Sequence, residues 1–112
     1  MNDETMEDLK RRFPEIFAVV ELVRDGTPLS FLIPQGVHLE IFSIMCATLM
    51  GAAGTATSEV GGQPPETAIA VAGSTSILVV AVDGKRLLAC ALRDSTDTDA
   101  VLQAMKEAAK ES

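Results

Sequence analysis

The segment from Ile41 to Ser58 carries no charged side chain, and this constrains the fold more than any other feature of the sequence. Pro34 and Gly36 interrupt the segment before it, and a long helix is predicted over about residues 38–58. Apolar residues lie on nearly every side of this helix, at Ile41, Phe42, Ile44, Met45, Cys46, Leu49, Ala52, Ala53 and Ala56. A helix on the surface of a small domain normally keeps a polar face for water, so this helix needs a second apolar surface.

Three environments could supply that surface. A transmembrane span needs about 20 apolar residues, but here hydroxyl side chains and two glycines dilute the stretch, and hairpin strands flank it. Burial within the domain is the second, yet a chain of 112 residues is too small to surround a helix about 30 Å long. The third is a second copy of the chain. We favour it because three or four large side chains left in water each forgo about 1.5–3 kcal/mol.

On this hypothesis the helix forms much of a homodimer interface. Gly51 and Gly54 leave two interpretations open, because small residues permit close helix approach but also permit a bend or a frayed end. The helix residues that we expect in the interface are Ile41, Phe42, Ile44, Met45, Thr48, Leu49 and Ala52.

The rest of the chain predicts five strands and two shorter helices. A first helix over about residues 4–12 begins at a capping box, Thr5 to Asp8, and ends before Pro14. Strands are expected at about 16–23, 29–33, 67–72, 76–82 and 87–92. The first two should form a hairpin around Asp25-Gly26 and the last three a meander. The segment Thr96–Asp99 should cap a final helix.

The strand segments 16–20, 77–82 and 87–92 are apolar at nearly every position, so helices must cover both faces of the sheet. The short charged helices suit one face and the long helix suits the other. We therefore predict a single α+β domain over residues 1–112. It is a three-layer α/β/α sandwich with a five-stranded antiparallel sheet and the element order α-β-β-α-β-β-β-α.

Charge and composition narrow the classes of partner. The formal net charge of −7 disfavours nucleic acid and anionic membrane surfaces, and no Tyr or Trp is available to stack on bases. The acidic N-terminal segment lacks the apolar core of a secretory signal, so we expect a cytoplasmic protein. Cys46 and Cys90 each lie in an apolar segment without CxxC spacing, and we expect buried free thiols in a reducing compartment.

The sequence predicts no catalytic, cofactor-binding or metal site, and we expect no enzyme. The phosphate-binding pattern GxxxxGK[ST] does not occur. His38 is the only histidine and begins the long helix, where a surface or capping role is expected. Ser74–Ser76 has no histidine partner in any motif. Asp94–Asp99 lacks the central glycine and terminal glutamate of an EF-hand, so helix capping explains it better. Lys10–Arg12 is interpreted as a solvated helix face, with contact to an acidic partner as the alternative.

The order and spacing of these features resemble the roadblock / dynein light-chain family, which includes the bacterial and archaeal MglB-like proteins. The resemblance extends from about Met6 to Glu111. It rests on Pro14, the small-residue-rich central helix, and the segments Val23–Leu29, Ser76–Val82 and Asp83–Ala89. It implies a homodimer in which the helix over Glu40–Ser58 packs on its mate. The strand over Thr67–Ala72 would then join two sheets into one, adding Thr67, Ile69 and Val71 to the interface.

The resemblance also implies a function. Members of the family bind small Ras-like GTPases, regulate or anchor them, or serve as adaptor subunits, and they act by contact. It therefore implies a non-enzymatic homodimeric regulator or scaffold that binds a small Ras-like GTPase and uses no cofactor. An adaptor subunit of a larger complex without a GTPase is the alternative. A small-ligand sensor or enzyme with a pocket between sheet and helix comes third, because no residue argues for it.

Overall fold

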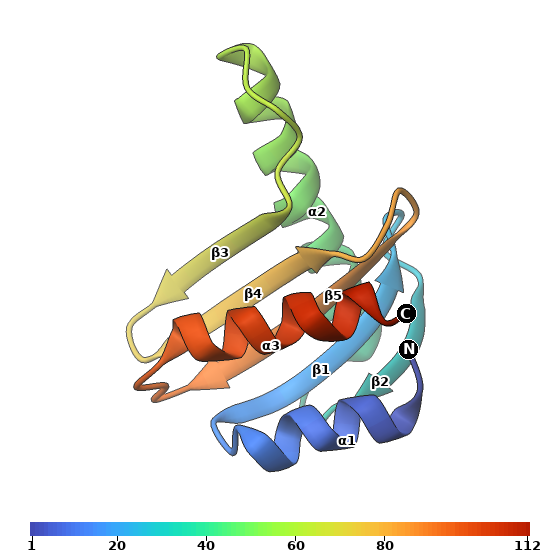
Figure 1. Cartoon of the computed structure of the whole chain (residues 1–112), viewed down its shortest axis with the longest axis vertical. Helices are drawn as coiled ribbons and strands as arrows, with labels where there is room; N and C mark the ends of the chain where they lie inside the picture. Colours follow the sequence, from blue (N-terminus) through green and yellow to red (C-terminus); the bar gives the residue numbers. More distant parts are fainter.

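The computed structural model describes every residue from Met1 to Ser112, and it has the predicted element order (Figure 1). The elements are α1 (Asp3–Arg12), β1 (Ile16–Val23), β2 (Pro28–Leu32), α2 (Leu39–Glu59), β3 (Thr67–Ala72), β4 (Thr75–Ala81), β5 (Arg86–Arg93) and α3 (Thr98–Lys110). The predicted α+β class, with five antiparallel strands in one sheet and helices on both faces, is confirmed.

The five strands form one antiparallel sheet in the order β2-β1-β5-β4-β3. The expected hairpin is β1–β2, and the expected meander is β3–β4–β5. The structure adds the junction between them, in which β1 pairs with β5 and places Val19 opposite Cys90. These two strands become the middle of the sheet because they are apolar on both faces, and nearly all their residues are buried.

Each face of the sheet has its own hydrophobic cluster. On one face α1 and α3 cover a cluster of 14 buried residues, among them Met6, Leu78, Leu88 and Met105. On the other face α2 covers a cluster of 9 buried residues, among them Met50. Figure 1 shows α1 and α3 side by side in front of the sheet and α2 behind it. The predicted division of the helices between the two faces is therefore confirmed.

One local prediction was wrong in detail. Asn2, rather than Thr5, caps α1, because its Oδ1 accepts hydrogen bonds from the backbone N–H and hydroxyl of Thr5. The β1–β2 turn uses the left-handed backbone of Gly26, whose φ is +101°. The β4–β5 turn, in contrast, is held by the Asp83 carboxylate, which accepts the backbone N–H groups of Lys85 and Arg86 at 2.8 Å. These hydrogen bonds, first that from Lys85, lower the pKa of Asp83.

One charged side chain lies inside the sheet. Glu21 on β1 is 2% exposed, and its two carboxylate oxygens accept hydrogen bonds from the amino group of Met1 and from Arg86 Nη1, both at 2.9 Å. A buried carboxylate is tolerated only when it is paired in this way. The charge cluster therefore fixes the start of the chain and the start of β5 against β1.

Candidate interaction surface

The α2 helix rests on the sheet by only a narrow strip of its surface. Its buried residues are Ser43, Cys46, Ala47 and Met50, which recur at helical spacing and face the second cluster. Figure 1 shows the C-terminal half of α2 extending beyond the edge of the sheet, where no other helix covers it. Most of the α2 surface is consequently open to solvent in the single chain.

The outward side of α2 is apolar and exposed. Ile41, Ile44 and Met45 are 58%, 48% and 54% exposed. Thr48 and Ala52 continue the same stripe toward the C-terminal end, and both are exposed. Phe42 and Leu49, which were also predicted for the interface, are half-buried and pack against the margin of the second cluster. The predicted helix residues therefore lie on one continuous side of α2, although two of them already contribute to the core.

The hydroxyl groups of α2 do not make its surface polar. Thr48 Oγ1 donates to the carbonyl of Ile44 at 2.8 Å, and Thr55 Oγ1 donates to the carbonyl of Gly51 at 3.2 Å. Thr57 makes the same kind of bond to Gly54 at 3.1 Å. Each hydroxyl is satisfied by the helix that carries it, so its methyl group is left for packing. The surface can be covered by another apolar surface without stranding these donors.

β3 provides a second open feature at the edge of the sheet. It pairs only with β4, so the backbone groups along its outer edge have no partner strand. Ile69 and Val71 are 47% and 71% exposed, whereas Thr67 is half-buried. Ile69 lies opposite Leu78, which belongs to the α1/α3 cluster, so Ile69 and Val71 point to the face away from α2.

The structure therefore does not gather all the predicted interface residues into one patch. The α2 residues lie behind the sheet, and the side chains of Ile69 and Val71 lie in front of it. A partner that pairs with the edge of β3 would lie next to both sets. Their role in an interface remains a prediction.

Sequence reasoning overlooked further exposed apolar residues. Leu29 and Phe31 on β2 are 49% and 47% exposed, and Val60 directly after α2 is 83% exposed. The exposed–intermediate alternation along β2 is typical of an edge strand with one open face. An alternation of large apolar and small polar residues in Leu29–Phe31 was the signal that could have revealed it.

The α2 helix is long and apolar enough, by length and composition alone, to cross a membrane, and 22% of its most apolar window is buried. Its surroundings argue against a span. The segment Val60–Glu66 returns beside the helix to β3 (Figure 1), and a Cβ on Gly54 would lie 3.8 Å from Pro65. A spanning α2 would carry this irregular backbone and Glu66 into the hydrocarbon, where its polar groups would have no partners. α2 is therefore the surface helix of a globular fold.

The residues considered for chemistry have structural roles. His38 is the N-cap of α2, and its Nδ1 accepts the backbone N–H of Ile41 at 3.4 Å. Asp97 caps α3 by accepting the backbone N–H of Ala100 at 3.0 Å. Cys46 and Cys90 are buried free thiols on opposite faces of the sheet, and burial raises the pKa of each to about 12. The expected capping roles of His38 and of the acidic loop and the expected burial of both thiols are thereby confirmed.

The comparison with solved structures identifies the fold. The structure is similar to a roadblock/LC7 domain from Streptomyces avermitilis, with a TM-score of 0.90 and 20% identity over 98% of this chain and 92% of that chain. The chain has the roadblock/LC7 fold. An MglB protein with a tetrameric arrangement is also similar, with a TM-score of 0.87 and 16% identity over 96% of this chain and 82% of that one.

Profilin IA from Acanthamoeba castellanii is a more distant neighbour, with a TM-score of 0.67 and 11% identity over 96% of this chain and 93% of profilin. No protein-family model and no curated protein sequence matches the chain. The roadblock/LC7 fold is thus established by structure, and function must be argued from the surfaces of the molecule.

Proposed function

We propose that this protein is a non-enzymatic homodimeric scaffold that binds a small Ras-like GTPase. The observation that carries the proposal is the outward side of α2, where Ile41, Ile44 and Met45 remain about half exposed on a helix without a charged residue between positions 41 and 58. Burying the remaining area of each side chain is worth roughly 1 kcal/mol. A second α2 helix supplies a matching surface, and a two-fold arrangement uses the same patch on both chains.

The open edge of β3 supports the same arrangement. Pairing of β3 with its copy would satisfy the free backbone groups and would give Ile69 and Val71 neighbours across the new strand pair. The resulting assembly would have a sheet continuous through both chains, with two α2 helices on one face. The tetrameric arrangement of the similar MglB structure is consistent with self-association of this fold.

The likeness to roadblock/LC7 and MglB structures supports the GTPase part of the proposal. The structural roles of the candidate residues also support it, because His38 and Asp97 cap helices and both thiols are buried. None of these side chains is arranged to act on a substrate, so the protein would work by contact. The combined surface of two α2 helices offers a platform for such a partner, and we place the GTPase there.

The experiment mixes the protein with the small Ras-like GTPases of its own cell, each loaded with GDP or with a GTP analogue. We expect one GTPase to form a complex in one nucleotide state, detected by size-exclusion chromatography and by a changed rate of GTP hydrolysis. The variant Thr48→Glu should weaken the complex because it disrupts the α2–α2 contact that forms the platform, whereas the matched variant Gln63→Glu, in the loop after α2, should not. Absence of a complex with every GTPase, together with recovery of a different protein bound to α2, would replace the proposal by the adaptor alternative.

A further inference from the structure

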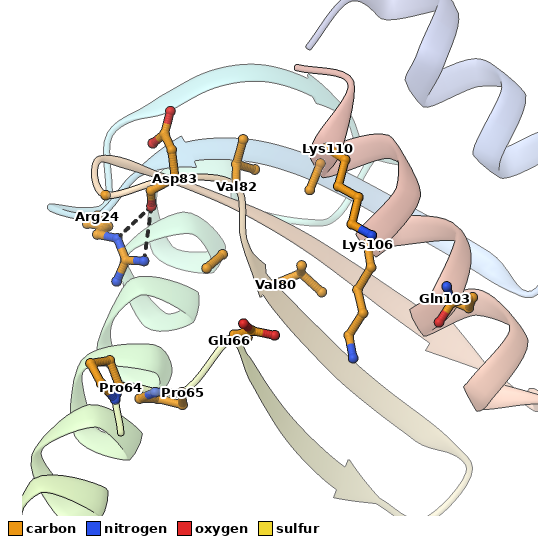
Figure 2. A pocket seen from close by; sticks show the side chains of 13 residues that line it. Arg24, Pro64, Pro65, Glu66, Val80, Val82, Asp83, Gln103, Lys106 and Lys110 are labelled. Carbon is orange, nitrogen blue, oxygen red and sulfur yellow. Dashed lines mark hydrogen bonds between the residues drawn. The ribbon is translucent and has the colours of Figure 1, made fainter. Parts of the chain in front are cut away.

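A cleft opens between the C-terminal half of α3, the two hairpin turns at the same end of the sheet, and the segment before β3. Its volume is about 590 Å³. Figure 2 shows Lys106 extending from α3 into the cleft toward Glu66, with Lys110 lying along α3 beside it and Arg24 on the opposite side. Val80 and Val82 line its floor, and Pro64 and Pro65 form one wall. The cleft is formed within one chain and does not depend on the proposed dimer.

The cleft is basic in a protein that is otherwise acidic. It contains three of the nine basic residues of the chain, Arg24, Lys106 and Lys110, but only two of the sixteen acidic residues, Glu66 and Asp83. Asp83 does not offset these charges, because its carboxylate is held by Arg86 at 2.9 Å and by backbone N–H groups of its own turn. Figure 2 shows that carboxylate pointing away from the hollow, while the carbonyl of Asp83 accepts hydrogen bonds from Arg24.

The two lysines lack internal partners. Neither Lys106 nor Lys110 forms an ion pair, whereas Arg11 and Arg12 on α1 both pair with Asp8. Like charges four residues apart on a helix repel each other and destabilise it by about 0.2–0.5 kcal/mol. Placing Lys110 in the last turn of α3 is favourable for the helix dipole. The helix dipole does not explain the position of Lys106, which lies one turn earlier and is directed into the cleft.

The lining favours a charged, extended ligand over an apolar metabolite. Small-molecule pockets of about 300–1,000 Å³ are lined mainly by apolar and aromatic side chains, but no aromatic residue lines this cleft. Gln103, Lys106 and Lys110 form a row along α3. The two lysines are separated by about 6 Å of helix rise, close to the roughly 6.6 Å between alternate side chains of an extended strand.

We propose that this cleft binds an extended acidic peptide segment of a partner protein, with carboxylates at alternate positions that pair with Lys106 and Lys110. Arg24 adds a third positive charge across the cleft, and Val80, Val82 and the two prolines contact the side chains between the carboxylates. Glu66 disfavours a carboxylate beside it, so it helps to set the register of the segment. The negative charge of the rest of the surface repels such a segment elsewhere and directs it to the cleft.

The test is an NMR titration of the full chain with a short capped peptide that has glutamates at alternate positions and valines between them. We expect saturable shift changes at Lys106, Lys110 and Arg24 that weaken as salt is added. The double variant K106Q/K110Q should bind roughly tenfold more weakly or worse, because two charge-assisted contacts are lost. The matched variant R11Q/R12Q removes the same charge from α1 and should bind like the original protein.

Three results would overturn the proposal. One is that the K106Q/K110Q variant binds the peptide as tightly as the original protein does. Another is that a peptide with glutamines in place of the glutamates binds as tightly as the acidic peptide. The third is that inorganic phosphate, at the same concentration as the peptide, causes equal shift changes at Lys106, Lys110 and Arg24. That result would show that the cleft is a site for small anions. Each measurement is made without a GTPase, so its outcome is independent of the GTPase proposal.

Discussion

The two faces of the sheet differ in how completely the chain covers them. On one face α1 and α3 enclose fourteen buried residues, and on the other α2 covers nine and extends beyond the sheet. The first face is thus closed by the chain itself. The second leaves Ile41, Ile44 and Met45 about half exposed on a helix that carries no charged side chain between positions 41 and 58. Stability of the single chain therefore comes mainly from the closed face, whereas the open face is the one suited to association.

Truncation of the closed face should have the largest effect on stability. Leu88 on β5 is 0% exposed and belongs to the larger cluster. Leu88→Ala should lower the free energy of unfolding by about 3–4 kcal/mol, through lost apolar burial and a cavity that the flanking strands cannot fill. Urea unfolding measures this. Ile41→Ala on the open face is the control, and a similar loss in that variant at concentrations where the chain is monomeric would contradict the contrast between the faces.

Disruption of the buried charge cluster around Glu21 should cause the second-largest loss of stability. Glu21→Gln leaves the amino group of Met1 and the guanidinium of Arg86 without their carboxylate. We expect a loss of roughly 2 kcal/mol, because charged donors lose their partner in a largely buried site. Thermal unfolding at pH 7 checks this, with Glu7→Gln on the exposed side of α1 as the control. Unchanged stability in Glu21→Gln would mean that the cluster is not formed in solution.

A pair of glycine substitutions tests how closely α2 packs against the β1–β2 turn. Gly26 and Gly36 both have a positive φ, +101° and +97°. A Cβ at Gly26 would lie 2.9 Å from the Cα of Ile44, whereas a Cβ at Gly36 would meet nothing within 4 Å. Both changes to alanine should cost about 1 kcal/mol for the backbone.

Gly26→Ala should cost more than Gly36→Ala because α2 must also shift away from the turn. Unfolding in urea gives both values, and amide exchange along α2 shows whether the helix has moved. Equal losses in the two variants would show that α2 does not rest on the turn.

The thiols probe the two faces with the smallest perturbation. The raised pKa values of Cys46 and Cys90, each about 12, mean that almost no thiolate exists at pH 8, so neither should react with a disulfide reagent in the folded protein. Unfolded thiols ionise near pH 8.5. Because folding raises these pKa values, the thiols favour the folded state below that pH, and stability should fall as pH rises toward 12.

In mild urea Cys46 should react before Cys90, because local opening of α2 exposes the thiol that α2 itself carries and leaves Cys90 on β5 buried. Mass spectrometry of the labelled protein gives the order. Labelling of Cys90 first would reverse the assignment of the less stable face.

Much of the fold could be predicted from the sequence because its signals are local. The uncharged stretch of α2, the apolar strands β1 and β5, and the break at Pro14 each depend on nearby residues, and the structure has them at the expected places. The role of Asn2 as the cap of α1 was missed because Thr5 also satisfies a capping pattern. The burial of Glu21 depends on partners 20 and 65 residues away.

The surfaces were less accessible to prediction for a similar reason. The stripe on α2 follows from helical spacing and was found. The face of the sheet to which Ile69 and Val71 point depends on the register of β3 with β4, and this register cannot be derived from the sequence alone. The basic cleft forms because β1 lies next to β5 and α3 crosses β4. Arg24, Lys106 and Lys110 therefore line the same cleft only in the folded chain.

The molecular mass of the protein in solution shows whether a second copy covers the outward side of α2. Sedimentation equilibrium over a wide range of concentrations should give a mass of twice 11.8 kDa for the wild-type chain. The variant Met45→Glu, which places a charge on the outward side of α2, should give 11.8 kDa while keeping its circular dichroism spectrum. A folded wild-type protein that remains at 11.8 kDa at every concentration would contradict the claim that the open face of the sheet is completed by a second copy.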